Sequence, residues 1–457
     1  NLGRKRKSSS SYWGTKCENW TKTFLGAPGT ELPSGQKIES TILREVPSAG
    51  MLCSASELNL DAKLESEESK NGLLIAHSET EIGKDYLSVM GLDSSVLEFE
   101  LTANRADCFS AIGIAREVSV LTGVPLMTPQ IELKEESSSQ SKEEISVSVE
   151  NPGLCPRFVA LTMTDMKVSQ SPLWLVKELQ SVGLRSINNV VDVTNFVMLE
   201  MGQPIHAYDR DCLAGKSLCA RLAKEDEKII TLDEKERALT TDMIIIADAK
   251  GPVGIAGVMG GLESEVTEKT QTIVIEAAVF HGPSIRKTSR ALGLRSDASG
   301  RFERGVDQEN CHLAALRVAQ LLQEMGAGNI SKGFLDIEGR PVDRKSICFS
   351  ENRINRFLGT NIELDQMLSI LQSLGCEILG NSDEMYEVMP PTWRSDITIF
   401  EDLAEEIIRI YGFDNIEPTL PTSASQVIQL PQLSKVERKA TDLFAGLGFN
   451  QCVHFSF

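Results

Sequence analysis

The sequence has few of the residues that bind structural zinc, and they are not grouped. The 457 residues include ten cysteines, scattered singly without a CxxC pair, and only five histidines. Zinc fingers and ribbons need closely spaced cysteine and histidine ligands, so the chain carries no zinc signature. We expect reduced thiols, of which Cys212 and Cys219 are the closest pair.

Long apolar runs are also absent. No run reaches the roughly 18 residues that a membrane span needs, and no signal-peptide pattern is present. We therefore expect a cytoplasmic protein without a membrane partner, although an organellar protein would fit as well. Hydrophobic residues make up 41% of the chain and charged residues 24%, as in ordinary globular proteins of about three domains.

Basic residues are outnumbered, and the formal net charge is -19. Bulk acidity argues against non-specific nucleic-acid binding. It leaves room for a specific RNA partner, because such binding depends on local lysine and arginine patches. The strongest basic run, Arg4 to Lys7, precedes four serines and is either a nucleic-acid contact or a disordered tail.

What the sequence does contain is polar residues inside two apolar stretches, 186–209 and 272–307. Asn188, Asn189, Asp192 and Asn195 interrupt a helical run, and Glu276 lies in the strand-like run 273–280. A buried carboxylate is unfavourable unless something pairs with it. The partner of Glu276 is either a structural arginine, Arg301 or Arg304, or a substrate.

Periodicity and end signals predict the main elements. Strands are expected at 30–38, 228–232, 243–247 and 273–280, and a strand, loop and helix over 96–126, with Asp107 or Ser110 as the helix cap and Gly123 at its end. Helices are expected at 171–183, 186–202, 308–325, 365–374 and 399–411.

Together with 51–58, 101–118 and 390–413, the two stretches 186–209 and 272–307 resemble the bacterial type of the phenylalanyl-tRNA synthetase beta family, in the same order. The resemblance runs from about Phe24 to the C-terminus. It implies an α+β multidomain chain that is incomplete at both ends. The expected parts are an unassigned N-terminus (1–23), a partial OB-type tRNA-binding barrel (24–92), a partial core α/β domain (93–128), a solvated Ser-rich linker (129–146), a mixed α/β editing domain of B3/B4 type (147–339), a winged-helix-like B5 domain (340–418) and the start of a catalytic-like domain (419–457).

The resemblance also implies an editing pocket that hydrolyses Tyr-tRNA, with Glu276 accepting a hydrogen bond from the tyrosine hydroxyl. The implied pocket residues are Arg185, Asn195, His206, Gly257, Gly260, Glu276, Ser296 and Ala298. Ser296 stands where many relatives have threonine, which loosens the pocket slightly. Read without the family, Asn195 and Asp192 would cap turns and His206 would be a turn histidine. The glycine-rich run 254–261 lacks phosphate-loop spacing and suits close backbone approach in a pocket wall.

Asp402, Glu405 and Glu406 share one helix face, with Asp396 just upstream. Four carboxylates at this spacing suit Mg²⁺, and the family implies a magnesium site here that is shared with the alpha subunit. The alternative is an acidic first turn favoured by the helix dipole.

The function implied is that of a phenylalanine-tRNA ligase beta subunit, in a heterotetramer of two alpha and two beta subunits. It would bind tRNA(Phe), edit, and scaffold the alpha subunit, where ATP is used. A non-catalytic RNA-binding or regulatory protein with the same fold is the alternative. A free-standing editing hydrolase is a third possibility, against which the B5-like part argues.

Overall fold

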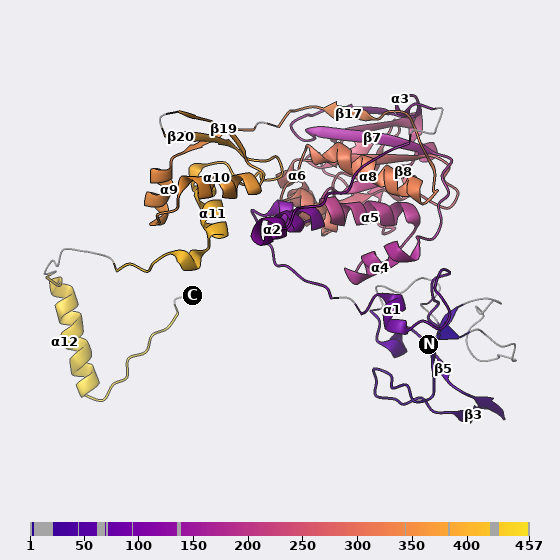
Figure 1. The fold of residues 1–457 in the computed structure, drawn as a ribbon, viewed down its shortest axis with the longest axis horizontal. Coiled ribbons are helices and arrows are strands. Elements are labelled where there is room, and N and C mark those ends of the chain that lie inside the picture. Colours follow the sequence, from indigo (N-terminus) through magenta and orange to yellow (C-terminus); the bar gives the residue numbers. More distant parts are fainter. Residues whose placement is uncertain are drawn as a thin grey trace. The chain divides into compact units, whose positions relative to one another are not determined.

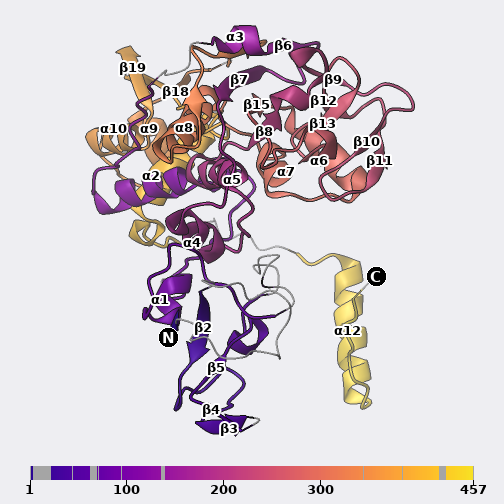
Figure 2. The same ribbon diagram turned by 90° about the vertical axis from the view of Figure 1, so that its right-hand side faces the viewer.

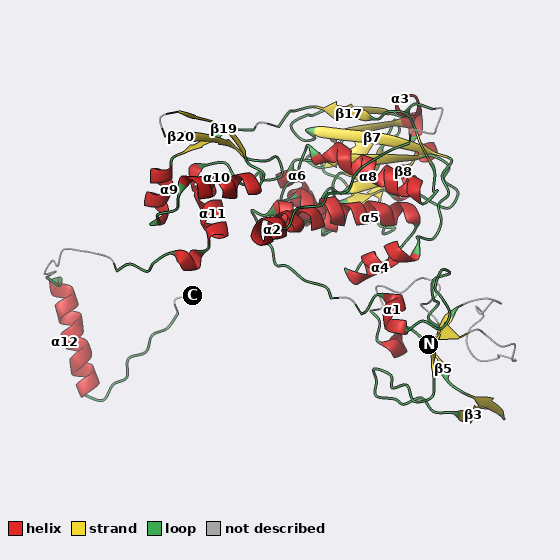
Figure 3. Cartoon of the chain, in the orientation of Figure 1, coloured by secondary structure: helices red, strands yellow, loops and turns green. Residues whose placement is uncertain are grey.

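The computed structural model describes residues 2–3, 22–43, 45–61, 69, 72–93, 95–134, 139–342, 344–382, 384–420 and 429–455. The chain divides into two compact units, Asn1–Tyr411 and Gly412–Phe457. The first contains nearly all of the strands and helices (Figure 1, Figure 3). The basic run Arg4 to Lys7 and the serines after it lie outside the described residues.

The segment 24–92 contains short strands around two small cores. A three-stranded sheet has the order β1-β2-β5, with bounds Leu2–Gly3, Thr23–Gly26 and Met51–Leu52. A hairpin pairs β3 and β4, Thr41–Leu43 and Val46–Ser48. Helix α1, Tyr86–Met90, packs Val89 against Phe24. The strand expected at 30–38 is a single bridge between Glu31 and Lys37, so the OB-type barrel stays a prediction.

Helix α2, Ala111–Thr122, begins and ends where the sequence predicts. The Ser110 hydroxyl accepts a hydrogen bond from the Gly113 amide, and Gly123 adopts a left-handed φ of 70°. The strand expected from Val96 does not form in the described residues 95–105. Val96, Leu97 and Phe99 are more than half exposed, so their backbone has no neighbouring strand to complete a ladder.

The structure differs from the predicted linker at its C-terminal end. Helix α3, Ser141–Glu144, and strand β6, Ser146–Val149, both lie in or begin within 129–146. Ser141 is buried, and its hydroxyl donates to the Gly333 carbonyl at 2.7 Å. The serine-rich composition predicted a solvated linker, but a serine hydroxyl that bonds a backbone partner can be buried without a large penalty.

Two five-stranded sheets form the centre of the next block. The first has the order β16-β7-β15-β8 with β17 also on β7, and its bounds are Asn329–Ile330, Arg157–Thr164, Ile273–Val279, Ile205–Asp209 and Leu335–Glu338. The second has the order β14-β13-β12-β9-β6, with bounds Met259–Gly260, Pro252–Ile255, Ile244–Ala247, Ser217–Leu222 and Ser146–Val149. A hairpin, β10 and β11, spans Lys228–Ile230 and Glu236–Ala238. All pairs are antiparallel except β6 with β9.

Strand β15 is buried along its whole length and separates two cores. Ile273, Ile275 and Ala277 pack with helices α4, α5 and α8, whose bounds are Leu173–Ser181, Asn189–Met201 and Asn310–Glu324. The alternate residues Val274 and Ala278 face the second sheet and helices α6 and α7, Gly282–Leu292 and Asp297–Phe302. Figure 2 shows β8 and β15 beside β12 and β13, with α6 and α7 next to them. Glu276 therefore projects into the core between the sheets.

Residues 347–411 form a smaller α+β part of the first unit. Its sheet has the order β18-β20-β19, with bounds Ile347–Phe349, Met385–Met389 and Glu377–Ser382. Its helices α9, α10 and α11 span Glu351–Leu358, Leu364–Ser373 and Phe400–Tyr411. The predicted helices at 365–374 and 399–411 are confirmed to within a residue. Winged-helix-like geometry for this part stays a prediction.

The second unit contains one long helix, α12, Gln432–Gly446, none of whose residues is buried. Among the described residues, no helix is both long enough and apolar enough to cross a membrane.

Candidate functional site

A cavity of about 100 Å³ lies between the two sheets. Strands β8 and β15 supply His206, Tyr208 and Glu276 to its wall. The turn from β13 to β14 supplies residues 254–260, and α7 supplies Ala298 and Phe302. The cavity is therefore built by the two stretches with unusual polar residues, 186–209 and 272–307, together with the glycine-rich run 254–261.

Glu276 is 6% exposed and forms no ion pair with any described residue. The Tyr208 hydroxyl donates to its Oε2 at 2.6 Å. Burial raises the pKa of Glu276 to about 7, although this hydrogen bond opposes the rise. Burial also raises the pKa of Tyr208 well above its usual value, so its hydroxyl keeps the proton that it donates.

The two arginines considered as structural partners of Glu276 lie elsewhere. Arg301 forms an ion pair with Asp297, and Arg304 forms one with Glu303. The salt-bridge interpretation of Glu276 is thus wrong, and its carboxylate is a buried acceptor served by a neutral hydroxyl.

His206 is the cross-strand partner of Glu276. Its ring stands edge-on to Tyr208, with centroids 4.5 Å apart at 79°. The Nε2 atom is enclosed and has no hydrogen-bond partner among the described residues. Burial lowers the pKa of His206 to about 4, so at neutral pH the ring is uncharged and one polar atom remains available to a bound molecule.

The glycines of 254–261 permit close backbone approach, as the sequence predicts. A Cβ on Gly260 would lie 2.6 Å from His206 Nε2, and one on Gly254 would lie 3.3 Å from the Tyr208 hydroxyl. Gly257 has a left-handed φ of 65°. A larger residue at position 260 would occupy the place of the His206 ring.

Five of the eight predicted pocket residues line this cavity: His206, Gly257, Gly260, Glu276 and Ala298. Arg185, Asn195 and Ser296 do not. Arg185 precedes α5 and Asn195 lies on it, and α5 packs against the opposite face of β15 from Glu276. Ser296 caps α7, accepting from the Ser299 amide, and its hydroxyl donates to the Val258 carbonyl, which steadies the cavity wall.

The other polar residues of 186–209 have structural partners. Asn188 caps α5, and the Asn189 amide group bonds the backbone of Ser169 and Lys167. The Asp192 carboxylate accepts from the Ser171 and Ser186 hydroxyls. It also accepts from the backbone amide of Ile187, so Asp192 satisfies the loop before α5. The functional residue that the sequence did not single out is Tyr208, and its signal was its place two residues after His206 on the same strand face.

The four predicted magnesium ligands are not gathered into a metal site. Arg394 donates two hydrogen bonds to Asp396, both at 2.9 Å, and two to Glu406, both at 2.8 Å. Asp402 accepts from the backbone amides of Thr398 and Ile399, and Glu405 is exposed. Within the described part of the chain, no group of three or more side chains is arranged to hold a metal ion.

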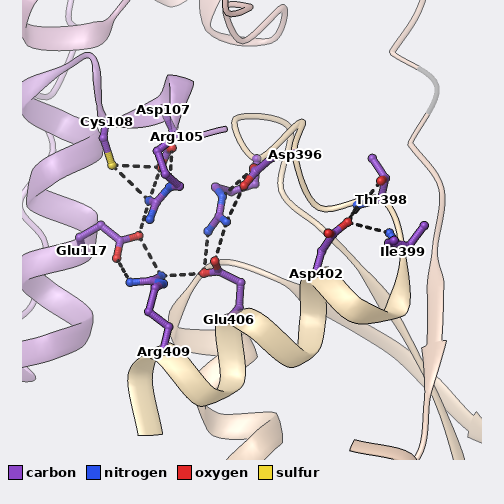
Figure 4. A network of polar contacts seen from close by, with 11 residues as sticks. Arg105, Asp107, Cys108, Glu117, Asp396, Thr398, Ile399, Asp402, Glu406 and Arg409 are labelled. Atoms are coloured by element: carbon purple, nitrogen blue, oxygen red, sulfur yellow. Dashed lines mark hydrogen bonds and ion pairs between the residues drawn. The ribbon is translucent and has the colours of Figure 1, made fainter. Parts of the chain in front are cut away.

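Figure 4 shows where Asp396, Asp402 and Glu406 point instead. Burial opposes ionisation of Glu406, but hydrogen bonds from Arg394 and Arg409 prevail and lower its pKa to about 2. Arg409 also pairs with Glu117 on α2. Asp396 and Glu406 therefore belong to an ion-pair network, and with Asp402 on backbone amides and Glu405 exposed the four residues do not fit a magnesium site, which corrects the expectation for Asp396, Asp402, Glu405 and Glu406.

Two family models match the chain, the B3/4 domain over residues 154–327 and the tRNA synthetase B5 domain over residues 347–413. The chain is 42% identical over 429 residues to the phenylalanine--tRNA ligase beta subunit of Moorella thermoacetica. It is 39% identical over 435 residues to that of Bacillus subtilis. These alignments cover 94% and 95% of the chain, and 53% and 54% of the relatives.

The chain thus spans about half the length of the curated relatives it matches. An N-terminal fragment of the phenylalanyl-tRNA synthetase beta subunit from Pyrococcus horikoshii is similar at 17% identity and a TM-score of 0.35, over 68% of this chain and 85% of that one. That likeness is too weak to carry a conclusion. The near-complete coverage by the bacterial relatives confirms the resemblance found in the sequence.

Proposed function

From a chain that carries the B3/4 and B5 domains of the bacterial phenylalanyl-tRNA synthetase beta family, we propose a beta subunit of phenylalanine-tRNA ligase that works in the cytoplasm. It binds tRNA(Phe), hydrolyses mischarged Tyr-tRNA(Phe) at the cavity around Glu276, and scaffolds an alpha subunit in a heterotetramer of two alpha and two beta subunits. The observation that carries the editing role is the buried Glu276 carboxylate, which lines a cavity and has no cationic partner among the described residues.

The chemistry of the substrates explains why such a carboxylate is useful. Tyrosine and phenylalanine differ by one hydroxyl, and an apolar synthetic site rejects the extra hydroxyl by only about a hundredfold. A second site that requires the hydroxyl can remove the error. A tyrosyl group would donate its hydroxyl to Glu276, whereas a phenylalanyl group would leave the buried acceptor unpaired, at roughly 1 to 3 kcal/mol.

The hydrolytic step needs water at the ester carbonyl, with cleavage of the bond to the ribose oxygen and release of tyrosine and tRNA. Among the described residues that line the cavity, no trio of nucleophile, general base and orienting group can be recognised. The uncharged His206 with its enclosed Nε2 suits a role in orienting the ester or the water by a hydrogen bond. Positioning of water by polar groups is therefore the mechanism that we favour.

Aminoacylation with ATP is assigned to the alpha subunit in this proposal. A magnesium ion shared between the subunits is not part of it, because two of the implied ligands, Asp396 and Glu406, each already accept two hydrogen bonds from Arg394.

The test is hydrolysis of Tyr-tRNA(Phe) and Phe-tRNA(Phe) by the purified chain, beside Glu276→Ala. The matched control is Glu268→Ala, which removes an exposed carboxylate from the same block. We expect selective loss of the tyrosyl ester with wild type and the control, and no selectivity with Glu276→Ala. Equal discrimination by Glu276→Ala would refute its role. Absence of hydrolysis with an alpha subunit added would favour the non-catalytic RNA-binding alternative.

A further inference from the structure

Tyr208 contacts the carboxylate on which the proposed editing reaction depends. In the ladder of β8 and β15, His206 lies opposite Glu276 and Tyr208 lies opposite Val274. Tyr208 is therefore the diagonal neighbour of Glu276 on the same sheet face, within reach of a long side chain. Its hydroxyl donates to Oε2 at 2.6 Å.

The position of the Tyr208 hydroxyl is fixed by its surroundings. The residue is 1% exposed and belongs to the core between the two sheets. Its ring packs edge-on against His206, and the missing side chain of Gly254 leaves room for the hydroxyl. These contacts pack the Tyr208 ring and direct its hydroxyl at Glu276.

Only one oxygen of Glu276 is used by this bond. Tyr208 is its sole hydrogen-bond partner among the described residues, and Glu276 itself lines the cavity. An ionised carboxylate has about four acceptor positions on two oxygens. A hydroxyl fixed on Oε2 thus orients the carboxylate and leaves Oε1 for a second donor.

We propose that Tyr208 is a specificity-determining positioning residue, whose hydroxyl holds one oxygen of Glu276 so that the other oxygen meets the hydroxyl of a bound tyrosyl group. This inference rests on the proposed editing function and extends it to a residue that does not itself touch the ester. It also assigns the two hydroxyls, one from the protein and one from the substrate, to different oxygens of one carboxylate.

The test compares Tyr208→Phe with wild type in the hydrolysis of Tyr-tRNA(Phe) and Phe-tRNA(Phe). The substitution removes only the hydroxyl and keeps the ring that fills the core. We expect the ratio of tyrosyl to phenylalanyl hydrolysis to fall by roughly ten- to a hundredfold, the usual range for a lost hydrogen bond to a charged group. The control is Tyr86→Phe, which removes an enclosed hydroxyl without a partner among the described residues and should leave the ratio unchanged. An equal fall in both rates would show a merely structural role and overturn the proposal.

Binding of L-tyrosinamide and L-phenylalaninamide, measured by calorimetry, separates this inference from the hydrolysis itself. Preference for tyrosinamide in wild type and its loss in Tyr208→Phe would support the inference even if no ester were cleaved. Preference retained by Tyr208→Phe but lost by Glu276→Ala would overturn the role of Tyr208 and leave that of Glu276. No preference in wild type by either assay would overturn both.

Discussion

At the scale of single residues, the charge on Glu276 has a consequence for stability. Burial raises its pKa to about 7, whereas an exposed glutamate titrates near 4.3. A group whose pKa is raised by folding favours the native state below its unfolded pKa, and this contribution is lost as the pH rises through the folded pKa. Ionised Glu276 therefore weakens the fold above about pH 7.

We predict that Glu276→Gln is more stable than wild type at pH 8 by roughly 3 kcal/mol, with little difference near pH 4.5. Glutamine keeps an oxygen for the Tyr208 hydroxyl and removes the charge. Urea unfolding at the two pH values measures the difference. Exposed Glu268→Gln is the control, and a stability gap that does not change with pH would contradict the prediction.

The residues of the cavity were predictable in part. Glu276 stood out because a carboxylate interrupted an apolar strand pattern, and glycines 257 and 260 because they formed a cluster. The contact of Tyr208 with Glu276 was not predictable, although its strand face was, since the partner is set by the register between β8 and β15, which the sequence does not state. The position of Asn195 away from this cavity was not predictable for a similar reason, because helical periodicity does not reveal which sheet face a helix covers.

At the scale of elements, α6 presents an unpaired basic face. Arg286 and Arg290 are one turn apart and exposed, and neither forms an ion pair with a described residue. The same helix buries Ile285, whose Cδ1 would lie 3.2 Å from a Cβ on Gly257 in the cavity wall. In a chain of net charge -19, two exposed arginines on a helix whose buried face backs the cavity wall are a local patch suited to RNA phosphates.

We predict that Arg286→Gln with Arg290→Gln weakens tRNA(Phe) binding and makes it less sensitive to salt. Log K falls as log salt rises, and the loss of two phosphate contacts makes this negative slope shallower by about 1.4 to 1.8. Filter binding between 50 and 200 mM salt measures it. Arg356→Gln with Lys435→Gln removes two exposed charges from α9 and α12 and should leave the slope unchanged. If both double variants had the same salt slope, the RNA would bind a surface other than α6.

Element prediction succeeded where local chemistry decides. Helices α2, α5 and α11 end at Gly123, Gly202 and Gly412, as their glycines indicated. It failed at Val96 and at 30–38, where a strand needs a neighbour that local sequence does not specify. The acidic face of α11 was located correctly, but its chemistry depended on Arg394, from the loop before the helix.

At the scale of the whole molecule, charged side chains connect distant parts of the first unit. Glu117 on α2 pairs with Arg409 on α11 at 2.6 Å, across 292 residues of sequence. Glu117 also accepts from Arg105 at 2.6 Å, and Arg409 donates to Glu406 at 2.6 Å. Figure 4 shows this chain of contacts between the two helices. The network gives the carboxylates of α11 a structural role that spacing alone could not distinguish from metal binding.

Arg394 is the most buried cation of this network, at 3% exposure, and it tests that role directly. Removing one member of a buried pair leaves the other charge uncompensated, at roughly 3 to 5 kcal/mol. We therefore predict that Arg394→Met lowers the free energy of unfolding by this amount, whereas exposed Arg356→Met has little effect. Addition of magnesium or of a chelator should leave the free energy of unfolding of wild type unchanged, because Arg394 already binds the carboxylates of Asp396 and Glu406. Stabilisation of wild type by magnesium, which would follow from binding to the native state, would return Asp396 and Glu406 to the metal site that the family resemblance implied.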